Sequence, residues 1–309
     1  MTNNSNNWQS WKISQLLIRW SRKVVLPGFQ GVSFYHVTRF FVKAMASGTL
    51  TTRSGSMAFS FFMAIFPSII FLFSLIPHIP IDNFQEILLA QLEALLPEEA
   101  YLLSKETIVD IINQPRGGLL SFGFLAALIF STNGTNAMIE GFNQSTIKLE
   151  SMSYLKQRLF AFLLFVIISS ITLFGVSLIM INQYAIEYLS DRHLLDSELR
   201  IILFQIARWT IIIFLFYFNI SFIYAFAPAV KKQWKFFSAG STLTTQLIIL
   251  TSIAFSYYIN NFGQYNKIYG SIGTLLVIML WLYLVSTFIL IGYELNASIS
   301  NAKLLHQDE

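Results

Sequence analysis

The sequence predicts an all-α, polytopic membrane protein with six transmembrane helices, an N-terminal interfacial amphipathic helix and an outer helical loop. Composition is the first reason: 55% of the 309 residues are hydrophobic and only 12% are charged, a balance typical of chains that lie in a bilayer. The second reason is a set of apolar runs, each long enough to cross a hydrocarbon core of roughly 30 Å at about 1.5 Å per residue. The predicted spans cover residues 54–79, 118–138, 159–182, 201–228, 237–259 and 271–295.

Residues 1–53 precede the first span and hold no long apolar run near the start, so we expect no cleavable signal peptide. Apolar residues recur at helical spacing from Phe34 to Ala44, with basic residues between them. We interpret this stretch as an amphipathic helix in the cytoplasmic interface, and an ordinary soluble helix is the alternative.

The first span contains Pro67, which should kink that helix because proline removes a backbone donor. Residues 80–117 follow as a long acidic connection with a helical apolar stripe, which indicates helices outside the membrane. The second span carries an unusually polar run from Ser131 to Asn136.

Three further segments lie outside the predicted spans. Residues 260–269 are expected to form a polar turn before the sixth span, and residues 301–309 to form a cytoplasmic tail. The connection at 183–200 is expected to be an acidic loop.

The distribution of basic residues predicts the orientation. Fourteen Lys and Arg residues lie in the segments on one side of the predicted spans and five on the other, while 11 acidic residues lie in the connections 80–117 and 183–200. Because cytoplasmic loops carry the basic excess, both termini are expected in the cytoplasm.

Two charged residues lie in the predicted spans. Arg208, in the fourth, costs at least about 2.5 kcal/mol at the bilayer centre. It is either a binding group for an anionic head facing a cavity, or a snorkelling or ion-paired structural residue. Glu294 is the only acidic residue in a predicted span. It either accepts a proton or lines a path, or it has a structural role, as a hydrogen-bond acceptor between helices or as a side chain that reaches the headgroups. Because the two lie in opposite halves of the membrane, we expect no direct pair.

Amide side chains complete the candidate substrate path. They can form hydrogen bonds between helices, and become a site only if several converge on one cavity. The residues are Asn133, Asn136 and Asn219, and Asn296 at the end of the last span can form the same kind of hydrogen bond between helices.

The sequence gives little support for an enzyme. It has no cysteine, and its four histidines are isolated and form no cluster of the kind that holds a catalytic metal. It has no P-loop and no Gly-x-Ser-x-Gly elbow. We therefore predict no catalytic residue, metal or cofactor, and attribute the basic excess to membrane topology rather than to nucleic-acid binding.

The last span carries motifs that identify a family resemblance. They are Tyr269-Gly270-Ser271-Ile272-Gly273, Trp281-Leu282-Tyr283 and Gly292-Tyr293-Glu294-Leu295-Asn296. The chain resembles the YihY/BrkB family of bacterial inner-membrane proteins, once called "ribonuclease BN", over roughly residues 30 to 300. The stretch from Ala58-Phe59 to Phe66-Pro67 looks like the family's first span. Phe142-Asn143-Gln144 resembles its Leu-Asn-Arg element, with Gln144 in place of the arginine.

The resemblance implies an inner-membrane protein associated with the cell envelope. Together with Arg208 and Glu294, it favours a transporter or exporter of an anionic or amphipathic envelope-related solute or lipid. The alternative is a non-catalytic scaffold in envelope assembly whose partner surface is loop 80–117. A membrane-associated ribonuclease acting in tRNA processing is the least favoured interpretation. Membrane lipids are the expected partners.

Overall fold

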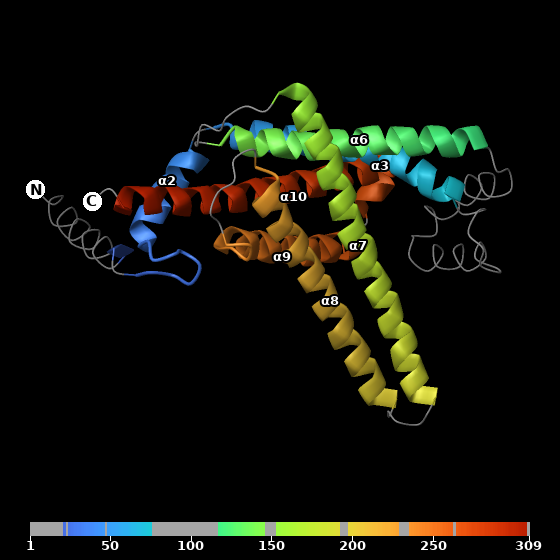
Figure 1. Cartoon of the computed structure of the whole chain (residues 1–309). Coiled ribbons are helices and arrows are strands. Elements are labelled where there is room, and N and C mark those ends of the chain that lie inside the picture. The colour runs from blue at the N-terminus through green and yellow to red at the C-terminus, as the bar shows by residue number, and fades with distance from the viewer. Residues whose placement is uncertain are drawn as a thin grey trace, which may run out of the picture. The chain divides into compact units, whose positions relative to one another are not determined.

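The computed structural model describes residues 21–22, 24–46, 48–75, 117–145, 153–191, 197–228, 235–261 and 264–307. Within these ranges the regular elements are all α-helices, so the all-α prediction is confirmed. The helices are α2 (Phe34–Met45), α3 (Leu50–Leu75), α6 (Gly117–Asn143), α7 (Tyr154–Asp191), α8 (Ser197–Phe226), α9 (Ala239–Asn261) and α10 (Gln264–Gln307), as labelled in Figure 1.

Six of these helices are long and apolar enough to cross a membrane, which confirms the predicted number of spans within the described residues. Their outer faces carry many exposed large apolar side chains, for example Phe122, Leu155 and Leu250. Because lipid rather than water surrounds a transmembrane helix, such an exterior needs no protein partner. The candidate spans are Leu50–Phe71, Ser121–Asn143, Tyr154–Gly175, Ile202–Phe226, Ala239–Tyr257 and Leu275–Leu304.

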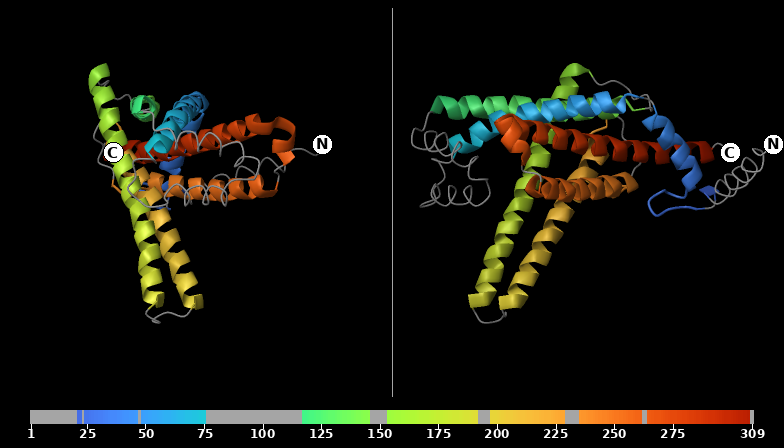
Figure 2. Two further views of the ribbon diagram at one scale, coloured as in Figure 1. Left: turned by 90° about the vertical axis from the view of Figure 1, so that its right-hand side faces the viewer. Right: turned by 180° about the vertical axis from the view of Figure 1, so that it is seen from behind.

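The chain divides into two units, one formed by Met1–Met57 with Thr135–Glu309 and the other by Ala58–Gly134. In the first unit, α7 and α8 run side by side in every view, α9 packs along α10, and α8 also contacts α9 (Figures 1 and 2).

Helix α2 belongs to the first unit and packs on the end of α10. Its Val37 is buried in one apolar cluster with Phe29, Val32, Ile299 and Ala302. The predicted amphipathic helix therefore exists and uses its apolar face against protein. Its placement in the membrane interface stays a prediction.

In the second unit, α3 and α6 approach each other closely at two glycines of α6. A Cβ atom on Gly123 would lie 3.1 Å from the backbone nitrogen of Phe71, and one on Gly134 would lie 2.8 Å from a ring carbon of Phe61. Small residues allow such close packing between membrane helices. Pro67 lies inside α3, which continues to Leu75.

Several predicted connections are wrong because helices continue through them. Most of the predicted turn 260–269 is helical, since α9 ends at Asn261 and α10 begins at Gln264. Helix α7 reaches Asp191 and α8 begins at Ser197, so much of the predicted loop 183–200 is helix. Hydropathy reports the depth of a residue in the membrane, and polar residues can extend a helix beyond that depth.

The remaining boundaries differ in the same way. Helix α3 begins at Leu50, inside the predicted N-terminal region 1–53, and α10 continues to Gln307, through most of the predicted tail. Loop 80–117 lies outside the described residues except for its last residue, where α6 begins.

Candidate functional site

A buried ion pair joins the last helix to the first span. Glu294 on α10 is fully buried, and its Oε1 accepts a hydrogen bond of 2.9 Å from Nη1 of Arg53 on α3. Its Oε2 accepts a hydrogen bond of 2.8 Å from the Ser145 hydroxyl, just after α6. Because a buried charge is costly without a partner, each member of the pair stabilises the other in this position.

Arg53 also caps α6. Its Nη1 donates a hydrogen bond of 2.9 Å to the carbonyl oxygen of Gly141. Gly141 lies in the last turn of α6, where backbone carbonyls lack an N–H partner within the helix. The Nε of Arg53 is buried and has no hydrogen-bond partner in the described part of the chain. One guanidinium therefore neutralises Glu294 and holds the end of α6 against α10.

Asn296 caps a different helix, close to Glu294 along α10. Its Oδ1 accepts a hydrogen bond of 2.9 Å from the backbone nitrogen of Gly240, and its Nδ2 donates to the Ser238 hydroxyl at 2.8 Å. Gly240 lies in the first turn of α9, whose N–H groups lack partners within the helix. Asn296 thus supplies a cap from a neighbouring helix instead of from the usual local position.

Gly292 makes this contact sterically feasible. It lies one turn before Asn296, and a Cβ atom there would meet the Thr244 hydroxyl and lie 2.6 Å from the Gly240 carbonyl oxygen. The Gly-x-Glu-x-Asn spacing therefore has a physical explanation. Gly292 lets α9 approach, Glu294 binds α3 and α6, and Asn296 caps α9.

Aromatic rings enclose this group of residues. The rings of Phe142 and Tyr293 stack with centroids 4.3 Å apart, and Tyr224 packs edge-on against both. The Tyr224 hydroxyl donates to the carbonyl of Ile289 at 2.7 Å. We refer to Arg53, Ser145, Glu294 and Asn296 as the polar cluster. The enclosure keeps its charges away from lipid and water.

The structure places the predicted path residue Arg208 elsewhere. It lies on α8, is exposed, and forms no hydrogen bond or ion pair with a side chain that the structure describes. Glu294 pairs with Arg53, in line with the expectation that it does not pair with Arg208.

The three predicted amides have separate surroundings. Asn136 donates to Glu140 at 2.6 Å and accepts from Gln157 at 2.9 Å. Asn219 donates to the Leu215 carbonyl of its own helix at 3.0 Å, and its Oδ1 is buried without a partner among the described residues. Asn133 is half-buried and belongs to the second unit.

The other signature residues occupy helices. Asn143 ends α6 and is half-buried, as is Trp281 on α10, whereas Gly273 is buried. Tyr269 and Gly270 lie in the first turns of α10 instead of in a turn before it.

Sequence reasoning missed Arg53 and Ser145, and treated Arg53 only as one of the topological charges. A usable signal existed, because Arg53 directly precedes the first apolar run and Glu294 needs a counter-charge.

A second correction concerns Glu140. Because the candidate span of α6 extends to Asn143, Glu294 is not the only acidic residue within a span. Among the described residues, no group of three or more His, Asp or Glu side chains is arranged to hold a metal ion.

Comparison with known proteins gives three findings. A family model described as "Virulence factor BrkB" matches residues 41–309. The "Putative ribonuclease-like protein YfkH" of Bacillus subtilis (strain 168) is 30% identical over 254 residues, which cover 82% of this chain and 91% of that protein. No solved structure matches the chain.

Shorter matches link the chain to bacterial proteins named as membrane proteins. A UPF0761 membrane protein of Tolumonas auensis is 31% identical over 86 residues, 28% of each chain. One from Photobacterium profundum is 28% identical over 117 residues, 38% of this chain and 37% of the relative. This chain therefore aligns with about a third of the length of those relatives.

Proposed function

This chain belongs to the virulence factor BrkB family of membrane proteins, and we propose that it transports or exports an anionic, amphipathic envelope solute or lipid across the bacterial inner membrane. The observation that carries the proposal is Arg208. It lies in the candidate span Ile202–Phe226, is exposed, and has no counter-charge among the described side chains. An ionisable residue at membrane depth marks a substrate path by default, and a guanidinium suits phosphate and carboxylate groups.

In this proposal the polar cluster closes the cytoplasmic end of the protein. It ties α10 to α3, α6 and α9 through charged and amide hydrogen bonds. A transporter that is open to the outer face needs a closed cytoplasmic end and a binding group that is accessible from outside. The polar cluster would provide the first and Arg208 the second. The orientation rests on the basic excess in the predicted cytoplasmic segments.

The test is transbilayer movement of a labelled lipid. Purified protein is reconstituted in vesicles that contain phosphatidylglycerol with a fluorescent headgroup-proximal label, and an impermeant reductant reports which leaflet holds the label. We expect wild type to move the lipid and Arg208→Gln to move it at least about fivefold more slowly, the loss expected from one basic residue. Arg158→Gln, which removes an arginine from α7, is the matched control.

Equal rates for wild type, Arg208→Gln and protein-free vesicles would overturn the proposal. The same variants in cells provide a second measurement, because a transport defect should make an envelope lipid or solute accumulate on one side of the membrane while the protein level stays normal.

A second candidate, a non-catalytic scaffold in envelope assembly, is favoured by a different observation. Each carboxylate oxygen of Glu294 already accepts a hydrogen bond from the protein. The grooves beside α8 are lined mainly by apolar side chains and so offer no continuous polar path. A scaffold would need its predicted partner surface, loop 80–117. Normal envelope composition with Arg208→Gln, combined with an envelope defect when loop 80–117 is replaced by a neutral linker, would favour this candidate.

We rank a membrane-associated ribonuclease last and propose that the chain is not an enzyme. One relative is named ribonuclease-like, so the activity can be tested directly. Cleavage of tRNA by the purified protein, abolished by substitution of a histidine or arginine, would reverse this ranking.

A further inference from the structure

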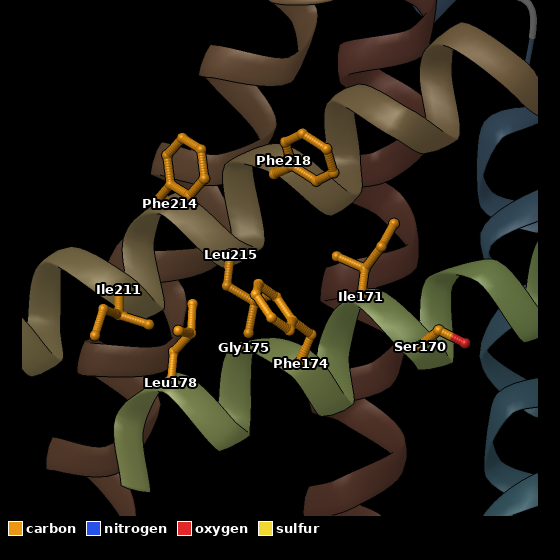
Figure 3. A pocket seen from close by; sticks show the side chains of 9 residues that line it. All are labelled: Ser170, Ile171, Phe174, Gly175, Leu178, Ile211, Phe214, Leu215 and Phe218. Atoms are coloured by element: carbon orange, nitrogen blue, oxygen red, sulfur yellow. The ribbon is translucent and has the colours of Figure 1, made fainter. Parts of the chain in front are cut away.

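Two apolar grooves flank α8. The first lies between α7 and α8, has a volume of about 380 Å³, and is shown in Figure 3. The second lies between α8 and α9 and has a volume of about 420 Å³. The first is lined almost wholly by apolar atoms, and the second mainly so, with two serines, Ser252 and Ser256, among its lining residues. On α8, the first is lined by Ile211, Phe214, Leu215 and Phe218, and the second by Trp209, Ile212, Ile213 and Phe216.

Arg208 lies at the same end of both grooves. Ile211 follows it by three residues and Ile212 by four, and residues at these spacings are neighbours on a helix surface. Ile211 lines the α7–α8 groove and Ile212 lines the α8–α9 groove. Arg208 is exposed and lines neither groove, and the helical spacing places it on the face of α8 between the two sets of lining residues.

The α8–α9 groove has amphipathic aromatic residues at this end. Trp209 and Tyr257 both line it and are largely exposed. Tryptophan and tyrosine favour the headgroup level of a bilayer, and the long side chain of Arg208 can extend toward that level from its position inside the candidate span. From there the groove continues along α8 to Phe216, about 10 Å at 1.5 Å per residue, which is a large part of one leaflet of roughly 15 Å.

We propose that a single anionic diacyl phospholipid straddles α8, with its headgroup phosphate on Arg208 and one acyl chain in each groove. The inference rests on the proposed function, and it names the substrate class and the site. Charge complementarity selects an anionic headgroup, because Arg208 offers an unneutralised cation among the described side chains. The presence of two grooves that share one cation selects a lipid with two chains.

The experiment uses Trp209 as the reporter in the full-length chain. The other five tryptophans are replaced by phenylalanine, namely Trp8, Trp11, Trp20, Trp234 and Trp281. The protein is reconstituted in phosphatidylcholine vesicles that contain either phosphatidylglycerol or phosphatidylcholine with brominated acyl chains, and bromine quenches Trp209 fluorescence on contact. We expect the anionic lipid to quench about fivefold more effectively at equal content, the preference that one arginine near the surface supplies.

Variants test the headgroup contact. Arg208→Gln should abolish the preference for the anionic lipid, Arg208→Lys should keep most of it, and Arg158→Gln should leave it unchanged. Equal quenching by the two lipids in the reporter protein, or a preference that survives Arg208→Gln, would overturn the inference.

A coupling measurement tests whether one molecule occupies both grooves. Ser170 lines the α7–α8 groove, and Ser170→Phe should fill it. If the same lipid occupies both grooves, this change should lower the anionic preference reported by Trp209 in the other groove. An unchanged preference would overturn the two-chain arrangement.

The outcomes separate this site from the proposed function. A selective, Arg208-dependent quenching without movement of labelled lipid would support the site and overturn transport. Movement of lipid that depends on Arg208, without selective quenching, would support transport and overturn the lipid site on α8.

Discussion

Arg53 and Glu294 explain how two charged residues can lie inside an apolar bundle. They are 241 positions apart in sequence and meet at 2.9 Å. The neighbouring acceptors are also hydrogen-bonded. Ser145 donates to the second carboxylate oxygen of Glu294, and Arg53 donates to the carbonyl oxygen of Gly141. Such a pair adds little over apolar residues of similar volume, but the removal of one member leaves a buried charge.

We predict that Glu294→Gln destabilises the protein by about 3 kcal/mol, because Arg53 remains charged and buried without a counter-charge. The measurement is the free energy of unfolding in mixed detergent micelles. The double variant Arg53→Met with Glu294→Leu should recover most of this loss.

Glu140→Gln is the matched control, since Glu140 is an exposed carboxylate on α6 and a glutamine oxygen can still accept the hydrogen bonds from Asn136 and Gln157. It should change the free energy of unfolding by less than about 1 kcal/mol, as is usual for exposed charges. A Glu294→Gln protein as stable as the control would show that Arg53 and Glu294 do not pair.

At the scale of elements, the contact between α9 and α10 depends on two glycines. A Cβ atom on Gly240 would meet the Gly292 carbonyl oxygen and lie 2.6 Å from the side chain of Asn296. The two backbones are therefore in direct contact, and this proximity lets Asn296 reach the first turn of α9. Small residues that allow backbone contact are a common basis of helix association in membranes.

We predict that Gly292→Ala destabilises the protein by about 2 kcal/mol, because the added methyl group has no space between α9 and α10. Gly55→Ala is the matched control. Gly55 also lies in a helix, and a Cβ atom there would meet nothing within 4 Å.

The control substitution should leave stability unchanged or raise it slightly, since alanine favours a helix more than glycine does. The comparison is made by unfolding in mixed micelles, with hydrogen exchange at residues 239–242 as a local probe of the α9 cap. Equal stability of the two alanine variants would contradict the close contact.

Element positions and element ends differ in how well the sequence predicted them. The apolar runs predicted six spans, and each has a corresponding helix. The ends were less predictable, because α7 continues to Asp191 and α10 starts at Gln264, both in polar sequence. An apolar run is bounded by the membrane surface, whereas a helix ends where capping or a breaker stops it.

At the scale of the whole molecule, the charge distribution predicts which face of the membrane holds each connection. Fourteen basic residues lie in segments assigned to the cytoplasm and five in segments assigned outside. This asymmetry is a statement about orientation alone, and it predicts residues 80–117 outside the cell membrane and both termini inside.

We predict that an impermeant maleimide labels Gln85→Cys in intact spheroplasts and does not label Ser10→Cys until the membrane is permeabilised. The chain has no cysteine, so each variant carries a single reactive thiol. Labelling of Ser10→Cys in intact spheroplasts would invert the orientation and move the proposed cytoplasmic closure to the outer face.

The sequence by itself determined the all-α class, the number of spans and the family, because each depends on local composition or on a contiguous motif. It also indicated Glu294 and Asn296, since polar residues in an apolar helix need partners. The tertiary structure decided which partners these are. Arg53, Ser145 and Gly240 come from distant parts of the chain, and only the packing of α3, α6 and α9 against α10 brings them together. In the same way, Arg208 could be recognised as costly from sequence, but its exposure between two grooves follows from the packing of α8 with α7 and α9.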